Sequence, residues 1–176
     1  PDARLSWLDH PVVQRHYQQR RLVQGLSWEH WVLTRFGGPA TCALELSCAD
    51  GQRSLYLHEQ RVAERVDGLD ARDALIDLAE RRRRDYGAPG IFRTADINAT
   101  QLPTGAYDLV FACHALHQAV ALEHIFDTVH DALTPRGLFV LEGYVGPSRF
   151  QWSRSQMAVV EALCALLPPA LTRLPW

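Results

Sequence analysis

Short apolar segments alternate with longer amphipathic segments along the middle of the chain. The short segments have the length of β-strands, and we predict strands at residues 42–46, 65–69, 91–93, 107–112 and 138–141. Apolar residues at helical spacing predict helices over residues 53–60, 73–84, 122–133 and 155–167. Because strands alternate with helices, we expect a mostly parallel sheet with right-handed crossovers, which is a doubly wound, Rossmann-like α/β fold.

The first 38 residues predict a pair of helices that precede the sheet. Asp9 caps the first of them and Gly25 ends it, while Ser27 caps the second, which stops at residues 37–39. Three tryptophans of this region are expected to pack between the two helices, with a lid over a binding site as the alternative: Trp7, Trp28 and Trp31.

Composition limits the classes of function that fit this chain. The 18 basic and 20 acidic residues give a net charge of −2, so no basic surface points to a nucleic-acid partner. Every basic residue is Arg, which excludes a Schiff-base or phosphate-loop lysine. The four cysteines have no CxxC spacing, which favours a reducing, cytoplasmic location. No apolar run reaches the ~18 residues of a membrane span.

Small and acidic residues follow the predicted strands, where ligands bind in open α/β sheets. Residues 47–51 form a loop of small side chains that lets backbone amides approach a ligand. Asp70 follows the second strand, 19 positions after Gly51, and its carboxylate suits a pair of ribose hydroxyls. Asp96 follows the third strand. The order of these groups favours a nucleoside, although a single Asp after a strand is more often a helix cap.

Six stretches extend this pattern over about residues 41–145: residues 43–51, 66–70, 95–98, 101–103, 107–111 and 133–138. With these motifs the chain resembles the class I S-adenosylmethionine-dependent methyltransferases. The resemblance implies strand order 3-2-1-4-5 and three segments within one domain. These are a helical cap at 1–38, a cofactor-binding core at 39–152, and a C-terminal helix with an apolar tail at 153–176. Residues 144–152 (Tyr-Val-Gly-Pro-Ser-Arg-Phe-Gln-Trp) further resemble a bacterial subgroup associated with glycan or sugar-linked methylation.

The resemblance implies specific roles toward S-adenosylmethionine and its product S-adenosylhomocysteine. Glu45 would organise the first loop, and Asp70 would bind the ribose hydroxyls. The adenine would lie beside Asp96 and Ile97, and the transferred methyl above Cys113. The remaining cofactor-binding residues are expected along the first loop and after the second strand: Leu46, Ser47, Asp50, Gly51 and Ala71.

The first loop departs from the family pattern Glu-x-Gly-x-Gly-x-Gly, because Ser47 and Ala49 replace the first two glycines. If these positions need a positive φ, a side chain there costs about 1 kcal/mol or more. We therefore expect a methyltransferase that acts at an oxygen of a small or glycan-linked acceptor, and we keep two alternatives to it. One is a scaffold of the same fold without catalysis. The other is a dinucleotide oxidoreductase, which ranks last because GxGxxG is missing.

Two histidines follow the fourth strand, where an acceptor would approach the methyl group. His114 or His117 could take a proton from a hydroxyl, and capping or packing at the next helix is the alternative. With His124 and His130 they complete no zinc spacing, so we predict no metal.

The fifth strand, residues 138–141, is apolar on both faces, and the two antiparallel strands that end this fold are missing after it. An open apolar edge favours aggregation. We therefore expect this strand and the apolar tail at 163–176 to contact a second copy of the chain, or sequence outside it.

Overall fold

The computed structural model describes residues 26–143 and 151–166, together with six residues of the N-terminal region: 11, 12, 15, 19, 22 and 23. The chain divides into two compact units, one of residues 1–27 and 145–176 and one of residues 28–144. The first unit holds β1 (Leu22–Val23), β2 (Leu26–Ser27) and α6 (Arg154–Leu166). The helix expected at 155–167 is confirmed by α6, whereas most of the helix expected after Asp9 lies outside the described residues.

A short hairpin stands where we expected one helix to end and the next to begin. Leu22 pairs with Ser27 and Val23 with Leu26, in antiparallel register. Ser27 is the last residue of β2 and directly precedes α2 (Trp28–Phe36), which is the position that we predicted for the cap of this helix. The expectation that Gly25 ends a helix falls on a residue outside the described part of the chain.

The second unit is built on a five-stranded sheet in which every neighbouring pair is parallel. The strand order is β5-β4-β3-β6-β7, which is the predicted order 3-2-1-4-5. The strands are β3 (Ala40–Leu46), β4 (Ala63–Asp70), β5 (Phe92–Thr94), β6 (Tyr107–Cys113) and β7 (Leu133–Glu142). The Rossmann-like α/β fold is thus confirmed, and each of the five strands overlaps the apolar segment that predicted it.

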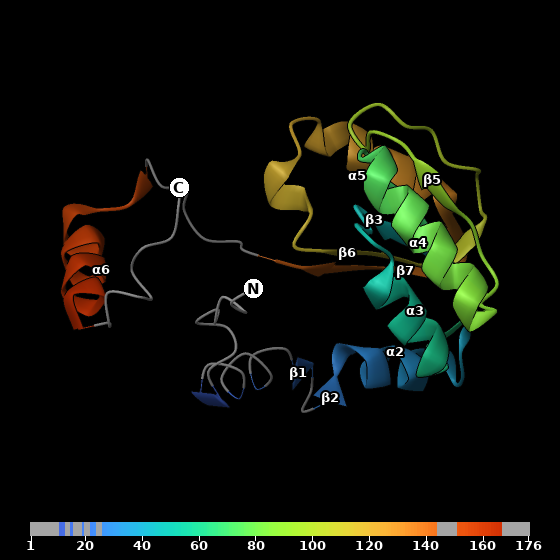
Figure 1. Cartoon of the computed structure of the whole chain (residues 1–176), viewed down its shortest axis with the longest axis horizontal. Helices are drawn as coiled ribbons and strands as arrows, with labels where there is room; N and C mark the ends of the chain where they lie inside the picture. Colours follow the sequence, from blue (N-terminus) through green and yellow to red (C-terminus); the bar gives the residue numbers. More distant parts are fainter. Residues whose placement is uncertain are drawn as a thin grey trace. The chain divides into compact units, whose positions relative to one another are not determined.

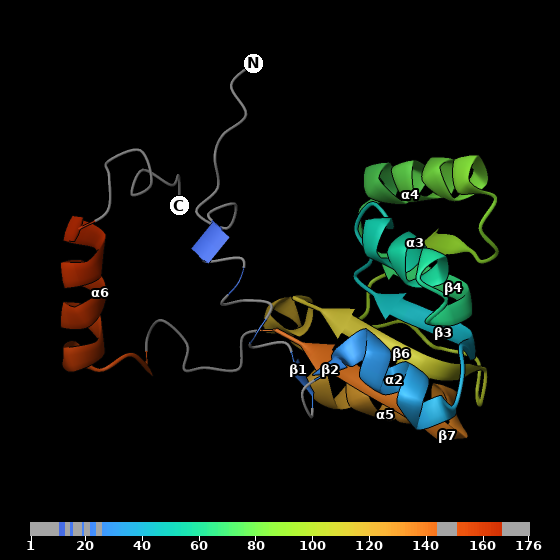
Figure 2. The same cartoon turned by 90° about the horizontal axis from the view of Figure 1, so that it is seen from below.

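Helices cover both faces of this sheet, as the alternation of elements requires (Figures 1 and 2). They are α2, α3 (Gln52–Glu59), α4 (Asp73–Tyr86), the short 3₁₀ helix η2 (Leu116–Gln118) and α5 (Leu122–Ala132). Figure 1 shows α4 in front of the strands and α5 behind them. The helices expected at 53–60, 73–84 and 122–133 are confirmed to within two residues at each end.

The alternating side chains of β3 separate two hydrophobic clusters. Ala43 belongs to a cluster that includes Trp28 of α2 and Leu57 of α3. Leu44 lies on the opposite face, in a cluster that includes Ile125 of α5. Trp28 is 4% exposed, so the preference for core packing over a lid is confirmed for this residue. It packs, however, against the sheet, with its ring centroid 5.9 Å from that of Phe111, and not between two helices.

One carboxylate ties three strands together at their amino ends. Asp108 of β6 accepts hydrogen bonds from the amides of Thr41 and Cys42 at 3.1 and 3.2 Å, and from the Thr134 hydroxyl at 3.2 Å. These bonds fix β3 and β7 on either side of β6. The same three strands are therefore held in register along their length, and this fixes the relative positions of the residues at their carboxyl ends.

β7 is longer than expected and corrects our prediction for residues 135–137. We expected Pro135 and Gly137 to make a turn before a strand at 138–141, but the strand begins at Leu133, where α5 ends. The ladder with β6 shifts register between Tyr107–Leu133 and Leu109–Leu138, so residues 134–137 interrupt the regular pairing. Pro135 is compatible with such an interruption because its missing amide leaves no ladder bond unmade.

No helix among the described residues has the length and apolar character needed to cross a membrane.

Candidate functional site at the carboxyl edge of the sheet

The loop that follows β3 is held in a left-handed backbone conformation at three positions. Ser47 has φ 56°, Ala49 has φ 50° and Gly51 has φ 73°. Glycine adopts this conformation freely, whereas a residue with a Cβ is strained there by about 1 kcal/mol or more. Ser47 and Ala49 therefore carry the strain that their replacement of glycine predicted.

Gly51 joins this loop to α3 at a point that has no room for a side chain. A Cβ on Gly51 would lie 2.9 Å from the Cβ of Ala79 and 3.1 Å from the ring of Phe92. The Gly51 carbonyl also accepts the amide of Leu55 at 3.0 Å, which starts the helix. The end of the loop thus packs directly on α4 and β5.

Asp70 ends β4 and faces the same loop. Its side chain is buried, and one carboxylate oxygen accepts the amide of Ala49 at 2.9 Å. The side chain of Arg72 donates two further bonds, Nε to Oδ1 at 2.9 Å and Nη2 to Oδ2 at 3.1 Å. Burial alone would raise the pKa of Asp70, but the hydrogen bonds from Arg72 and Ala49 outweigh it and lower the pKa below its ordinary value. Asp70 is therefore a carboxylate at neutral pH.

Glu45, near the end of β3, lies beneath the loop and behaves in the opposite way. It is 4% exposed and accepts the hydroxyl of Ser54 at 2.5 Å. Burial raises the pKa of Glu45 to about 8, and the bond from Ser54 and the charge of Arg53 offset only part of that rise. Ser54 is fully buried on α3 and was not among the predicted site residues, because an isolated Ser in a helix gives no signal in sequence.

The third strand end lies beside Asp70, because the amide of Ala95 donates to the Asp70 carbonyl at 2.9 Å. Asp96 is exposed and accepts the amide and side-chain nitrogen of Asn98 at 2.9 and 2.8 Å. These bonds lower the pKa of Asp96. Asn98 in turn accepts the amides of Val120 and Ala121, which ties this loop to the start of α5. Ile97 is half-buried between them.

A second group of side chains gathers where β6 and β7 end. Glu142, at the end of β7, has one carboxylate oxygen 3.8 Å from the Sγ of Cys113 and the other 3.8 Å from the Nε2 of His114. The His114 amide donates to the Glu142 carbonyl at 2.6 Å, and His114 has φ 53°. A strained residue that is held this firmly is a feature of functional sites. Sequence reasoning named Cys113 and His114 but missed Glu142, which is distant in sequence and joins them only through the β6–β7 pairing.

The other histidines of this region lie on different elements, η2 and α5. His117 lies on η2 and is exposed. His124 bonds the carbonyl of Thr100 at 3.0 Å, and His130 contacts Asp131. Within the described ranges, no three side chains of His, Cys, Asp or Glu come together as metal ligands.

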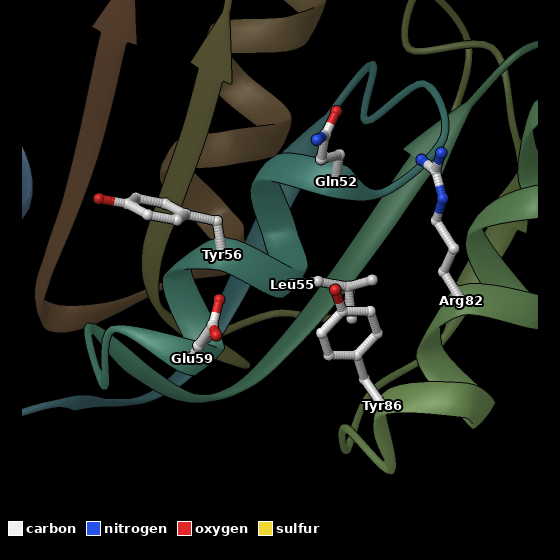
Figure 3. Close-up of a pocket in the computed structure, with 6 residues that line it drawn as sticks. All are labelled: Gln52, Leu55, Tyr56, Glu59, Arg82 and Tyr86. Carbon is white, nitrogen blue, oxygen red and sulfur yellow. The ribbon is translucent and has the colours of Figure 1, made fainter.

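A separate cleft of about 290 Å³ lies between α3 and α4 (Figure 3). Figure 3 shows Arg82 extending from α4 toward the loop that precedes Gln52. Arg82 donates to the Asp50 carbonyl at 3.2 Å and forms an ion pair with its carboxylate. The cleft thus borders the loop after β3 without containing any strand-end residue. Its lining residues are Gln52, Leu55, Tyr56, Glu59, Arg82 and Tyr86.

Known proteins share both this fold and part of this sequence. The sequence profile of the family described as "Methyltransferase domain" matches residues 43–137, more than half of the chain. A solved S-adenosylmethionine-dependent methyltransferase from Mesorhizobium loti is 29% identical and has a TM-score of 0.56. That match covers 65% of this chain and 50% of the other. The chain therefore belongs to the methyltransferase domain family, and S-adenosylmethionine is the cofactor that this membership implies.

Two further similarities concern the variety of proteins that contain this domain. Over 76 residues the chain is 37% identical to the hybrid PKS-NRPS synthetase fsa1 of Fusarium sp. (strain FN080326), which covers 41% of this chain and 2% of the synthetase. The solved [4+2]-cyclase SpnF shares the fold at a TM-score of 0.58 and 19% identity, over 80% of this chain and 47% of the cyclase. The chain thus spans about half the length, or much less, of these similar proteins.

Proposed function

We propose that this chain transfers the methyl group of S-adenosylmethionine to a hydroxyl oxygen of a small acceptor. The observation that carries the proposal is the bond between the buried Asp70 carboxylate and the amide of Ala49 at 2.9 Å. It brings the acidic strand end and the small-residue loop together at the edge where doubly wound folds bind nucleotides.

The residues of this edge fit an adenosyl cofactor. Asp70 supplies a carboxylate acceptor for vicinal hydroxyls, and the loop at residues 47–51 contacts it through the amide of Ala49. Ala71, Asp96 and Ile97 would flank the nucleoside, and the methionine portion would lie along the loop that begins at Leu46. When bound, S-adenosylmethionine supplies an electrophilic methyl group on a sulfonium.

The chain's own contribution to the reaction is to align the acceptor and to accept its proton. His114 is 47% exposed and follows β6 at the same edge as Asp70, so an acceptor hydroxyl has access to its imidazole. Glu142 is a positioning residue that holds His114 through its carbonyl and faces the imidazole with its carboxylate. His117 is the second candidate for the proton acceptor.

Two classes of acceptor follow from different observations. The proposal of a glycan-linked hydroxyl rests on the resemblance of residues 144–152 to a glycan-associated subgroup. Most of these residues lie outside the part of the chain that the structure describes. A polyketide or peptide intermediate rests on the similarity to three PKS-NRPS synthetases. Purified protein, S-adenosylmethionine and one acceptor of each class would separate them, with the product analysed by mass spectrometry.

The alternative is a scaffold of the same fold without catalysis. It is favoured by the strained backbone of Ser47 and Ala49 in the loop after β3. Calorimetry with S-adenosylmethionine, S-adenosylhomocysteine and NAD tests the choice. Binding of the first two supports the methyltransferase, binding of none supports the scaffold, and binding of NAD alone would overturn both.

We also propose a cytoplasmic location and self-association through β7. The outer edge of β7 pairs with no strand among the described residues, and Leu141 on this strand is 49% exposed.

A further inference from the structure

Four hydrogen bonds converge on the carboxylate of Asp70. Oδ1 accepts the backbone amide of Arg72 at 3.0 Å and its Nε at 2.9 Å. Oδ2 accepts the amide of Ala49 at 2.9 Å and the Nη2 of Arg72 at 3.1 Å. Because an ionised carboxylate has about four lone-pair sites, these donors occupy all of its accepting capacity.

The four donors fall into two kinds. The two backbone amides belong to the fixed fold and stay on Asp70, where they hold its orientation. The two guanidinium donors belong to a side chain that is 65% exposed and has solvent to move into. Release of the guanidinium therefore frees one lone pair on each oxygen. Two free acceptors on one carboxylate match the two vicinal hydroxyls of a ribose.

We propose that Arg72 competes with the ribose hydroxyls for Asp70 and thereby sets the affinity and salt dependence of cofactor binding. This inference rests on the proposed function, since it takes Asp70 as the ribose acceptor. The guanidinium leaves Asp70 when the nucleoside binds and returns when it departs. Because an exposed ion pair is screened by salt and a hydrogen bond to a hydroxyl is screened less, added salt favours the nucleoside over Arg72.

Calorimetric titration of S-adenosylhomocysteine into wild type and Arg72→Ala tests the competition at 50 mM and 500 mM NaCl. Because the pair joins an exposed guanidinium to a buried carboxylate, we expect Arg72→Ala to bind at least about two- to fivefold more tightly at low salt, the ratio that a fully exposed pair would give. The ratio of the two affinities should approach one at high salt. Arg84→Ala is the matched control, because it removes the same charge from an arginine on α4 that is 60% exposed and pairs with Glu80.

A second titration isolates the hydroxyls. The gain from Arg72→Ala should persist with adenosine and disappear with 2′,3′-dideoxyadenosine, which offers Asp70 no donor. Equal or weaker binding by Arg72→Ala, with normal binding by wild type, would overturn the role of Arg72 and leave the proposed function standing. Failure of wild type and every variant to bind S-adenosylhomocysteine would overturn both.

Discussion

The amide of Ala49 donates to the carboxylate of Asp70, 21 positions later in the chain, at 2.9 Å. This bond joins the loop after β3 to the end of β4. Each of its two residues has a feature that bears on cofactor binding. Ala49 is strained, with φ 50°, and Asp70 is already held by Arg72. The ends of β3 and β4 are thus linked directly, and substitutions at each of them test its contribution to cofactor binding.

Asp70→Ala should weaken binding of S-adenosylhomocysteine about ten- to a hundredfold. The change removes a charged acceptor, and a hydrogen bond to a charged group contributes ~1.5–3 kcal/mol. Calorimetry measures the loss, and circular dichroism establishes that the variant is folded. Asp85→Ala, at an exposed position of α4, is the control and should bind as wild type does. Unchanged affinity in Asp70→Ala would remove Asp70 from the cofactor site.

The double change of Ser47 and Ala49 to glycine should tighten cofactor binding. Glycine relieves about 1 kcal/mol of strain at each positive φ and widens the space beside the loop, while greater freedom of the unfolded chain offsets part of the gain in stability. Titration of S-adenosylhomocysteine compares the two proteins. Arg61→Gly is the control, because Arg61 also has a positive φ, 55°, but lies between α3 and β4. Weaker binding by the glycine variant would refute the strain argument.

The stability of the protein should fall as pH rises toward the pKa of Glu45. The pKa is about 8 in the folded chain and near 4.5 when unfolded, so between these values the folded state binds more protons. Linkage then lowers the free energy of unfolding with rising pH, by at most about 1.4 kcal/mol per pH unit from this one group. The contribution is complete below pH 4.5 and lost above pH 8.

Urea denaturation at pH 6, 7 and 8 measures this slope. Glu45→Gln keeps a neutral hydrogen-bonding side chain beside Ser54 and should flatten the pH dependence. Glu64→Gln, exposed on β4, should leave it as in wild type. Parallel slopes for wild type and Glu45→Gln would show that Glu45 is ionised in the folded protein.

His114→Asn should lower kcat for methyl transfer about a hundredfold or more and leave the affinity for S-adenosylhomocysteine unchanged. General-base catalysis contributes roughly 10²–10⁴ in rate. Asn is the appropriate replacement, since it tolerates the positive φ of residue 114 better than most side chains. The acceptor assay of the proposed function provides the rate. His117→Ala tests the second candidate in the same assay, and His130→Ala, at an exposed position of α5, is the control.

The role of Glu142 as a positioning residue is tested by comparing kcat with cofactor affinity. Glu142→Gln keeps the backbone carbonyl that accepts the His114 amide and removes the carboxylate that faces the imidazole. We expect it to lower kcat for methyl transfer and to leave the affinity for S-adenosylhomocysteine unchanged. Glu142→Asp should restore part of kcat, and an unchanged kcat in Glu142→Gln would remove Glu142 from the site.

Apolar periodicity predicted the strands and their order because each buried strand is a local apolar run. Periodicity did not predict that residues 133–137 belong to β7, because the irregular pairing there depends on the register of β7 against β6. Periodicity also did not predict that α2 packs on the sheet. The contact between Trp28 and Phe111 joins residues far apart in the sequence and depends on tertiary packing.

The site follows the same division. Asp70 was visible as an acidic residue at a strand end, whereas Glu45 was named only through the resemblance to the methyltransferases. Glu142 and Arg72 were not named, because one reaches His114 through strand pairing and the other reads as an ordinary exposed arginine in sequence.

Because β7 lies at an open edge of the sheet, we predict that the chain self-associates through this strand. Residues 138–141 are apolar, and the strand pairs with β6 on one side only within the described residues. Such an edge templates pairing with another strand, and charged side chains normally prevent this. Leu163 and Leu166 of α6 are 57% and 81% exposed and were expected to share the interface.

Light scattering over a range of concentrations should therefore show a dimer of the wild-type chain. Leu141→Lys should shift it toward monomer, because a lysine on the edge strand disfavours the close approach of a second copy. Ile91→Lys is the control, since Ile91 is 56% exposed at the opposite edge of the sheet, beside β5. A monomeric wild type with rapid hydrogen exchange along residues 138–141 would show that the protein tolerates an open β7 edge.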